Sequence, residues 1–164
     1  MKITVLNTGG TFNKRYNPII GLLEVPSDNI ALEKIVKSCF NVEFDIRTII
    51  SKDSLDFTQK DREIILENIK NSTSDKIIII HGTDTVDLTA QFIDGKIEDK
   101  KVVFTGAMIP MSIDEVEATM NFSQAIGFLN APIQNGIYLS MHGSVIEHSK
   151  LKKDRSLGQF IIKN

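Results

Sequence analysis

Hydroxyl side chains and glycines gather in two short segments, each of which follows an apolar run. Thr8-Gly9-Gly10-Thr11 comes after residues 2–7, and His81-Gly82-Thr83-Asp84-Thr85 comes after residues 76–80. Glycines let backbone N–H groups approach a ligand, and a Thr hydroxyl attacks a carbonyl carbon once a base removes its proton. The segments therefore predict nucleophilic chemistry or a small polar-ligand site. A structural turn and a helix cap explain the same residues without any chemistry.

A base for such a hydroxyl is not identified by spacing alone. The three histidines, at positions 81, 142 and 148, fit no triad scheme and include no helical pair that would hold a metal ion. Each is more readily explained as a structural, hydrogen-bonded side chain. Lysines are the other candidates, because burial and neighbouring charges can lower a lysine pKa. The run Lys150-Leu151-Lys152-Lys153-Asp154-Arg155 contains three of them but is equally typical of a solvated face.

The elements that must position these segments follow from an alternation of β-rich runs and helical patterns. We expect strands over residues 2–7, 42–50, 76–80, 101–105 and 136–141, and helices over residues 28–38, 58–70, 86–93 and 115–129. This order predicts an α/β fold, a three-layer, doubly wound, mostly parallel sheet with helices on both faces. Ligands bind beyond the carboxyl ends of the strands of such sheets. That rule selects the loops at 8–11, 51–56, 81–85, 106–112 and 142–149.

The same patterns predict how two helices begin. Thr58 followed three positions later by Asp61 is typical of a capping box. For the first predicted helix we expect Ser27 or Asp28 to be the cap and Ile30 to face the core.

Composition limits the classes of protein to which the chain can belong. Its 164 residues fit one domain, and 41% hydrophobic with 24% charged residues is typical of a soluble globular protein. A net charge of −2 argues against a nucleic-acid partner, and the apolar run Ile77–Ile80 is too short for a membrane span. The single Cys39 rules out an internal disulfide. We expect a cytoplasmic protein with no nucleic-acid or membrane partner.

With these elements in place, the loops resemble those of the bacterial-type L-asparaginase/glutaminase family. The likeness runs along nearly the whole chain and is carried by Thr8-Gly9-Gly10-Thr11, Asp53-Ser54-Leu55-Asp56, His81-Gly82-Thr83-Asp84-Thr85, Thr105-Gly106-Ala107-Met108-Ile109-Pro110, Asn121 and the strand Gly136-Ile137-Tyr138-Leu139-Ser140-Met141. It covers the N-terminal domain of the family. We therefore expect residues 1–164 to form a single asparaginase N-terminal-like domain, with the C-terminal domain of the family absent.

The resemblance implies catalytic roles for five residues. Thr11 matches the family's primary nucleophile, and Tyr16 matches the flap tyrosine beside it, although the flap here is much shorter. Thr83 and Lys153 match the second catalytic pair. Asp84 matches the carboxylate that holds the lysine or the ammonium group of the substrate.

It also implies substrate contacts. Ser54 matches the residue that binds the substrate α-carboxylate, Ala107 matches a backbone contact to the leaving amide, and the backbone near Gly10 matches an oxyanion site. Leu55 stands where the family usually has a polar residue, which removes one contact. Counting without gaps places the lysine at 153, with Lys152 as the alternative.

The implied function is an asparaginase-like amidohydrolase that releases ammonia from asparagine or a related small amide through a Thr acyl-enzyme, without a metal ion or an organic cofactor. We expect a homodimer or homotetramer. Two alternatives stay open: a non-catalytic module that binds a small amino acid or carboxylate, and a catalytic domain that needs a partner subunit. A nucleotide-binding domain is disfavoured, because residues 8–11 lack a phosphate-loop lysine.

Overall fold

A six-stranded sheet forms the centre of the computed structural model, which describes residues 1–163. In chain order the elements are β1 (Lys2–Gly9), η1 (Thr11–Asn13), β2 (Arg15–Asn17), β3 (Leu22–Glu24), α1 (Ile30–Val36), β4 (Glu43–Lys52), η2 (Ser54–Asp56), α2 (Gln59–Lys70), β5 (Lys76–Ile80), α3 (Val86–Ile93), β6 (Lys101–Thr105), α4 (Glu115–Asn130), β7 (Gly136–Met141), β8 (Ser144–Glu147), η3 (His148–Lys150), β9 (Leu151–Asp154) and β10 (Gln159–Ile162). Five strands of the sheet are parallel, and only β8 at one edge is antiparallel.

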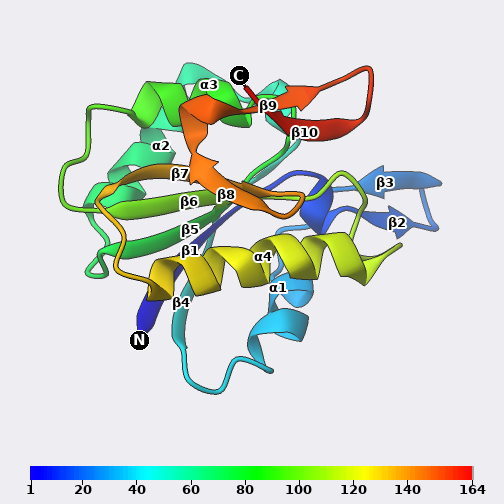
Figure 1. The fold of residues 1–164 in the computed structure, drawn as a ribbon. Coiled ribbons are helices and arrows are strands. Elements are labelled where there is room, and N and C mark those ends of the chain that lie inside the picture. Colours follow the sequence, from blue (N-terminus) through cyan, green and yellow to red (C-terminus); the bar gives the residue numbers. More distant parts are fainter. Residues whose placement is uncertain (164) are drawn as a thin grey trace.

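Helices cover both faces of this sheet, so the predicted three-layer α/β fold is confirmed (Figure 1). Along β5, Ile77 and Ile79 face the core beneath α2 and α3, whereas Ile78 and Ile80 face the core beneath α1 and α4. All four side chains are fully buried. Because both faces of this strand are buried, consecutive residues are apolar, and the sequence shows a continuous apolar run.

The predicted elements are confirmed with small shifts at their ends, and one predicted cap is wrong. The Thr58–Asp61 capping box is present, with both reciprocal hydrogen bonds. The first helix begins at Ile30 with Asn29 at the N-cap position, and the carboxylate of Asp28 accepts both Arg15 and the N–H of Ile30. Ile30 is half exposed and does not face the core as expected.

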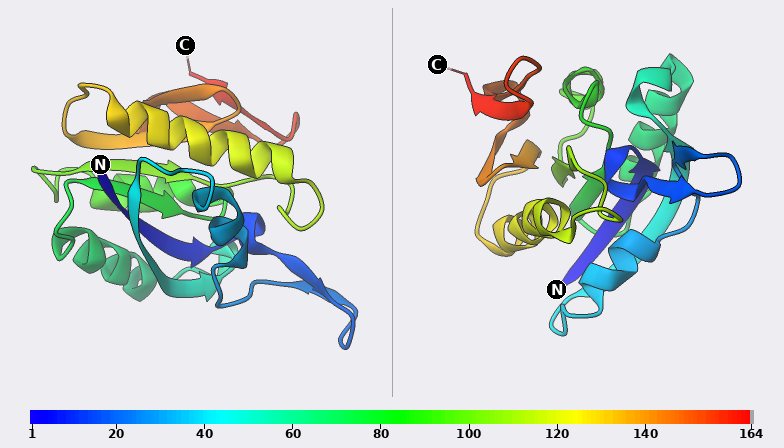
Figure 2. Two further views of the ribbon diagram at one scale, coloured as in Figure 1. Left: turned by 90° about the horizontal axis from the view of Figure 1, so that it is seen from below. Right: turned by 90° about the vertical axis from the view of Figure 1, so that its right-hand side faces the viewer.

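Two antiparallel hairpins outside the central sheet were not predicted. The hairpin of β2 and β3 projects from the domain, and the hairpin of β9 and β10 packs beside α3 (Figures 1 and 2). Their strands are only three or four residues long. Segments that short carry too few residues to display an alternating pattern.

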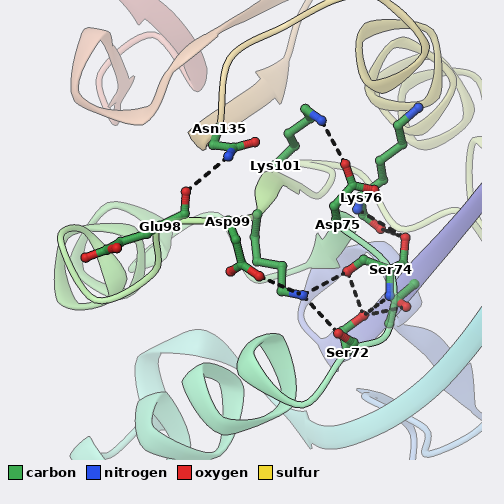
Figure 3. A network of polar contacts seen from close by, with 10 residues as sticks. Ser72, Ser74, Asp75, Lys76, Glu98, Asp99, Lys101 and Asn135 are labelled. Carbon is green, nitrogen blue, oxygen red and sulfur yellow. Dashed lines mark hydrogen bonds and ion pairs between the residues drawn. The ribbon is translucent and has the colours of Figure 1, made fainter.

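A buried polar network lies at the end of the sheet where the parallel strands begin (Figure 3). The Nζ atom of Lys100 donates to the carbonyl oxygens of Ser72 at 2.9 Å and Ser74 at 3.4 Å. Ser74 Oγ in turn donates to the carbonyl oxygens of Lys2 and Lys76, at the start of β1 and β5. These contacts connect the first residues of the strands, at the end of the sheet opposite the glycine-rich loops.

Candidate active site

The direction of the strand order reverses between β1 and β5. In the order β4-β1-β5-β6-β7-β8, the chain leaves β1 toward β4 on one side of the sheet and leaves β5 toward β6 on the other. Loops that diverge in this way leave a crevice at the carboxyl ends of the two strands, where open α/β sheets bind their ligands. Thr11 follows β1, and Thr83 follows β5. Both predicted hydroxyl groups therefore stand at the switch point.

Close backbone contact between four loops shapes this crevice. A methyl group added to Gly10 would lie 2.5 Å from Gly82 Cα, and one added to Gly82 would lie 2.5 Å from Ser54 Oγ. A methyl group added to Gly106 would lie 2.4 Å from the carbonyl oxygen of His81. Real Cβ atoms do not approach other atoms so closely, so glycine is required at all three positions. The loops after β1, β4, β5 and β6 thus form one packed surface around Thr83.

Thr83, Lys153 and Asp84 form the most direct chemical arrangement in this crevice. Lys153 Nζ lies 2.9 Å from Thr83 Oγ1 and 3.0 Å from Asp84 Oδ1. Thr83 is buried, and the Lys153 side chain is only 15% exposed. A hydroxyl group within hydrogen-bond reach of an amine, which is itself oriented by a third group, is the geometry of an activated nucleophile.

The hairpin of β9 and β10 brings Lys153 to Thr83. In this hairpin Lys153 pairs with Phe160, and the backbone N–H of Phe160 donates to His142 Nδ1 at 3.1 Å. His142 Nε2 lies 2.9 Å from Glu117 Oε1 on α4, so the imidazole links the hairpin to the body of the domain. The neighbouring Lys152 is exposed, and it is Lys153 that contacts Thr83 and Asp84.

Thr11 and Tyr16 are placed differently from the Thr83 group. Thr11 is partly buried in η1, and within residues 1–163 its hydroxyl group makes no hydrogen bond. Tyr16 lies on β2 with 62% of its surface exposed, and its hydroxyl oxygen is 4.0 Å from where a methyl group on Gly21 would lie. Its phenol thus extends along the projecting hairpin. The structure joins Thr11 to the site through the contact of Gly10 with Gly82.

The loop after β4 contributes a buried hydroxyl group and an ion pair. Ser54 is 1% exposed, and its Oγ has no hydrogen-bond partner in the described part of the chain, while Leu55 is largely exposed. Asp53 is paired with Lys14 at 2.5 Å. Burial opposes the charged form of Asp53, but the ammonium of Lys14, the N–H of Leu55 and the charge of Lys153 outweigh it and lower the pKa of this carboxyl group.

The loop after β6 is held in place by α4. Asn121 Nδ2 donates to the carbonyl oxygen of Gly106 at 3.0 Å, and the Glu117 carboxylate accepts the N–H groups of Met108 and Ile109. Ala107 is buried between these anchors. Asn121 and Glu117 lie four positions apart on the same face of the helix, so one helix face fixes the whole loop.

His81 serves the architecture, in agreement with the structural interpretation of the histidines. It is buried, with Nδ1 2.8 Å from the carbonyl oxygen of Gly82 and Nε2 2.9 Å from Thr89 Oγ1. Because a carbonyl only accepts, Nδ1 carries the proton. Burial lowers the pKa of His81 to about 4, although the hydrogen bond to Gly82 opposes this shift. The predicted helix cap is present only in part, since Thr85 occupies the N-cap position but donates its hydroxyl to the carbonyl oxygen of Ser54.

Two further features concern ligands and membranes. No three His, Cys, Asp or Glu side chains of residues 1–163 gather as metal ligands would. Within the same range, no helix combines the length and hydrophobicity needed to cross a bilayer.

The fold and the site together define a doubly wound α/β domain with an amine-paired threonine at its switch point. A family model described as "Asparaginase, N-terminal" matches residues 2–159, and the chain belongs to this family. The resemblance drawn from the motifs is thereby confirmed.

Individual relatives agree with this assignment. The chain is 26% identical over 162 residues to an L-asparaginase of Thermococcus kodakarensis, covering 96% of this chain and 49% of the relative. It is 28% identical over 149 residues to one subunit of the glutamyl-tRNA(Gln) amidotransferase of Methanococcus vannielii, covering 87% of this chain and 34% of that protein. The chain thus spans half or less of the length of these curated relatives.

Solved structures match over nearly the whole chain. The thermostable L-asparaginase from Thermococcus kodakarensis superimposes with a TM-score of 0.86 at 26% identity, covering 99% of this chain and 51% of that one. L-asparaginase I from Vibrio cholerae shares the fold, with a TM-score of 0.82 at 24% identity.

Proposed function

We propose that this domain carries the catalytic groups of an asparaginase-type amidohydrolase, which releases ammonia from the side-chain amide of asparagine or a related small amide. The observation that carries the proposal is the contact of Lys153 Nζ with both Thr83 Oγ1 and Asp84 Oδ1. Binding a small ligand does not require an amine that is buried against a threonine hydroxyl. Hydrolysis by an activated hydroxyl group does.

The proposed reaction has two halves. In the first, a threonine hydroxyl attacks the amide carbon, and its proton passes through Lys153 to the departing nitrogen. Ammonia then departs, and the acyl group stays bound to the threonine oxygen as an ester. In the second, water attacks the ester, the acid product departs and the proton returns to the threonine oxygen. Following the resemblance, Thr11 is the proposed nucleophile, and the Thr83–Lys153 pair handles the proton. Attack by Thr83, which Lys153 contacts directly, is the alternative. Lys153 must be neutral when it accepts that proton.

Backbone and side-chain groups around the crevice supply the remaining contacts. The N–H groups near Gly10 and Thr83 are proposed to hold the developing oxyanion, which is the largest single contribution in many acyl transfers. The buried, unpartnered hydroxyl of Ser54 is proposed to meet the carboxylate of the substrate. The buried loop at Ala107 is proposed to face the leaving amide.

The amidotransferase relatives favour a second candidate. In that case the same hydroxyl chemistry would release ammonia within a complex, and a separate subunit would use it. This version predicts that ammonia release rises when the partner subunit is added.

Two large side chains near the site are exposed to solvent. Leu55, next to the buried Ser54, and Tyr16 on the hairpin that follows Thr11 are both more than 60% exposed. We propose that a second copy of the chain covers these side chains, in a homodimer or a homotetramer. A monomeric mass in sedimentation at micromolar concentration would contradict it.

The test is ammonia release from asparagine, glutamine and a panel of small primary amides. Thr11→Ala and Thr83→Ala should abolish release, and the matched control Thr73→Ala, at an exposed position away from the site, should not. Mass spectrometry of a trapped acyl adduct would then assign the ester to Thr11 or to Thr83. Tight binding of asparagine without any release would favour a binding module instead.

A further inference from the structure

Two cations share one oxygen of Asp84. Lys153 Nζ lies 3.0 Å and Arg155 Nη1 2.9 Å from Asp84 Oδ1, and Arg155 Nη2 donates to the carbonyl oxygen of Asp84 at 3.2 Å. Arg155 therefore binds Asp84 through both terminal nitrogens of its guanidinium group. Lys153 approaches from the buried side, with a side chain that is 15% exposed, and Arg155 approaches from the solvent side, with one that is 65% exposed.

The hairpin of β9 and β10 positions both Lys153 and Arg155 next to Asp84. Lys153 lies on β9, and Arg155 follows directly after the strand, in the turn that leads to β10; both side chains reach Asp84. Asp154 between them points elsewhere, where its Oδ1 accepts the N–H groups of Ser156 and Leu157 and shapes the turn. The approach of Arg155 is thus set by the turn, and the guanidinium is presented to Asp84 before any ligand arrives.

Arg155 alone balances the negative charge of Asp84, and it does so whether Lys153 is charged or, as the proposed proton transfer requires, neutral. Asp87 and Lys152 line the adjoining pocket and cancel each other. The pair of Asp53 and Lys14 cancels in the same way. The site therefore offers no net negative charge to the ammonium group of a ligand, because a guanidinium already occupies Asp84.

From this arrangement we infer that Arg155 determines specificity by occupying Asp84 from the solvent side, so that the site selects amides that bear a carboxylate and lack an ammonium group. The inference rests on the proposed amidohydrolase function and names its substrate class: half-amides of dicarboxylic acids, of which succinamate is the simplest analogue of asparagine. To bind asparagine through Asp84, the protein must break both Arg155 contacts or place an ammonium beside a guanidinium.

The experiment compares kcat/KM for ammonia release from succinamate and from asparagine. The wild-type chain should prefer succinamate by about tenfold or more, and Arg155→Gln should lower that ratio by about tenfold, mainly through better use of asparagine. Lys150→Gln is the matched control, because it removes an exposed positive charge that pairs with Glu147 and does not contact Asp84. A wild-type preference for asparagine, or an unchanged ratio in Arg155→Gln, would overturn the inference.

Binding measurements separate this inference from the proposed function. If no amide releases ammonia, the amidohydrolase proposal fails, and calorimetry with succinate and aspartate then tests the charge selection alone. Preference for succinate in the wild type that is lost in Arg155→Gln supports the role of Arg155. Equal binding of the two acids, preference for aspartate, or no binding of either would overturn it. Thermal melts of the variant check that exposed Arg155 is not needed for folding.

Discussion

Lys153 Nζ lies 2.9 Å from Thr83 Oγ1, although seventy positions separate the two residues in the chain. Thr83 follows a central strand, and Lys153 belongs to a hairpin outside the central sheet. The contact therefore depends on how the hairpin docks, through His142 and Phe160, onto the domain.

Replacing Lys153 tests whether this contact has a chemical role. Lys153→Met removes the amine and keeps much of the apolar stem, so ammonia release should fall by about a hundredfold or more, as expected for loss of a proton-transfer group. Asp84 keeps its contact with Arg155 in this variant, which limits the effect on folding. Steady-state kinetics give the result, and Lys150→Met is the control for loss of a lysine in the same segment. Loss of release in Lys152→Met with full activity in Lys153→Met would assign the role to the neighbouring position.

Gly10 offers a test of the close loop packing. Its φ of 74° and ψ of −173° lie in a region that essentially only glycine occupies, and a methyl group there would also lie 2.5 Å from Gly82 Cα. Gly95 has a similar φ of 72° but open space around it. Gly95→Ala should lower the free energy of unfolding by about 1–2 kcal/mol from strain alone, and Gly10→Ala by about 2 kcal/mol more. Urea denaturation measures both, and equal losses would show that the loops do not pack as described.

The central sheet could be predicted because each strand and helix carries its own pattern. The run Ile77–Ile80 and the capping box at Thr58 are local signals, and the structure confirms both. The rule that ligands bind beyond the carboxyl ends of parallel strands placed the loops of Thr11 and Thr83 at one end of the sheet, whereas the switch point depends on a strand order that was not predicted.

The parts that escaped prediction depend on tertiary contacts. Spacing alone did not separate Lys153 from Lys152, because the choice depends on the register of β9 with β10. The contact of Arg155 with Asp84 was not predicted, because Arg155 lies in a basic run that is typical of a solvated face. The N-cap residue Asn29 was missed, and its Oδ1 accepts from Asn7 Nδ2 and Thr48 Oγ1 on the central sheet.

Lys100 tests the network at the end of the sheet where the parallel strands begin. Its buried ammonium donates to the carbonyl oxygens of Ser72 and Ser74, and Lys100→Met leaves those acceptors without this donor. The free energy of unfolding should fall by about 1–3 kcal/mol, as for loss of one partner of a buried polar contact. Lys101→Met is the control, since the pair of Lys101 with Asp75 lies nearer the surface and should be worth less than about 1 kcal/mol. Urea denaturation should separate the two variants, and ammonia release should persist in both, because the site lies at the other end of the sheet.

His81 should make the domain sensitive to mild acid. Its pKa is about 4 in the folded chain, because of burial, and near 6.5 when unfolded, so between these values only the unfolded state binds the proton. The free energy of unfolding should therefore fall as the pH drops through this window, by about 1 kcal/mol between pH 7.5 and pH 5.5 and about 3 kcal/mol in full near pH 4. His81→Gln lowers stability at every pH through its lost contacts with Gly82 and Thr89, but it should remove this slope. Urea denaturation is measured for both proteins from pH 7.5 to pH 5.5, above the range where carboxyl groups titrate. The difference between their slopes gives the contribution of His81, because His142 and His148 are common to both proteins. Parallel slopes in the two proteins would mean that His81 takes up its proton in the folded state as readily as in the unfolded chain.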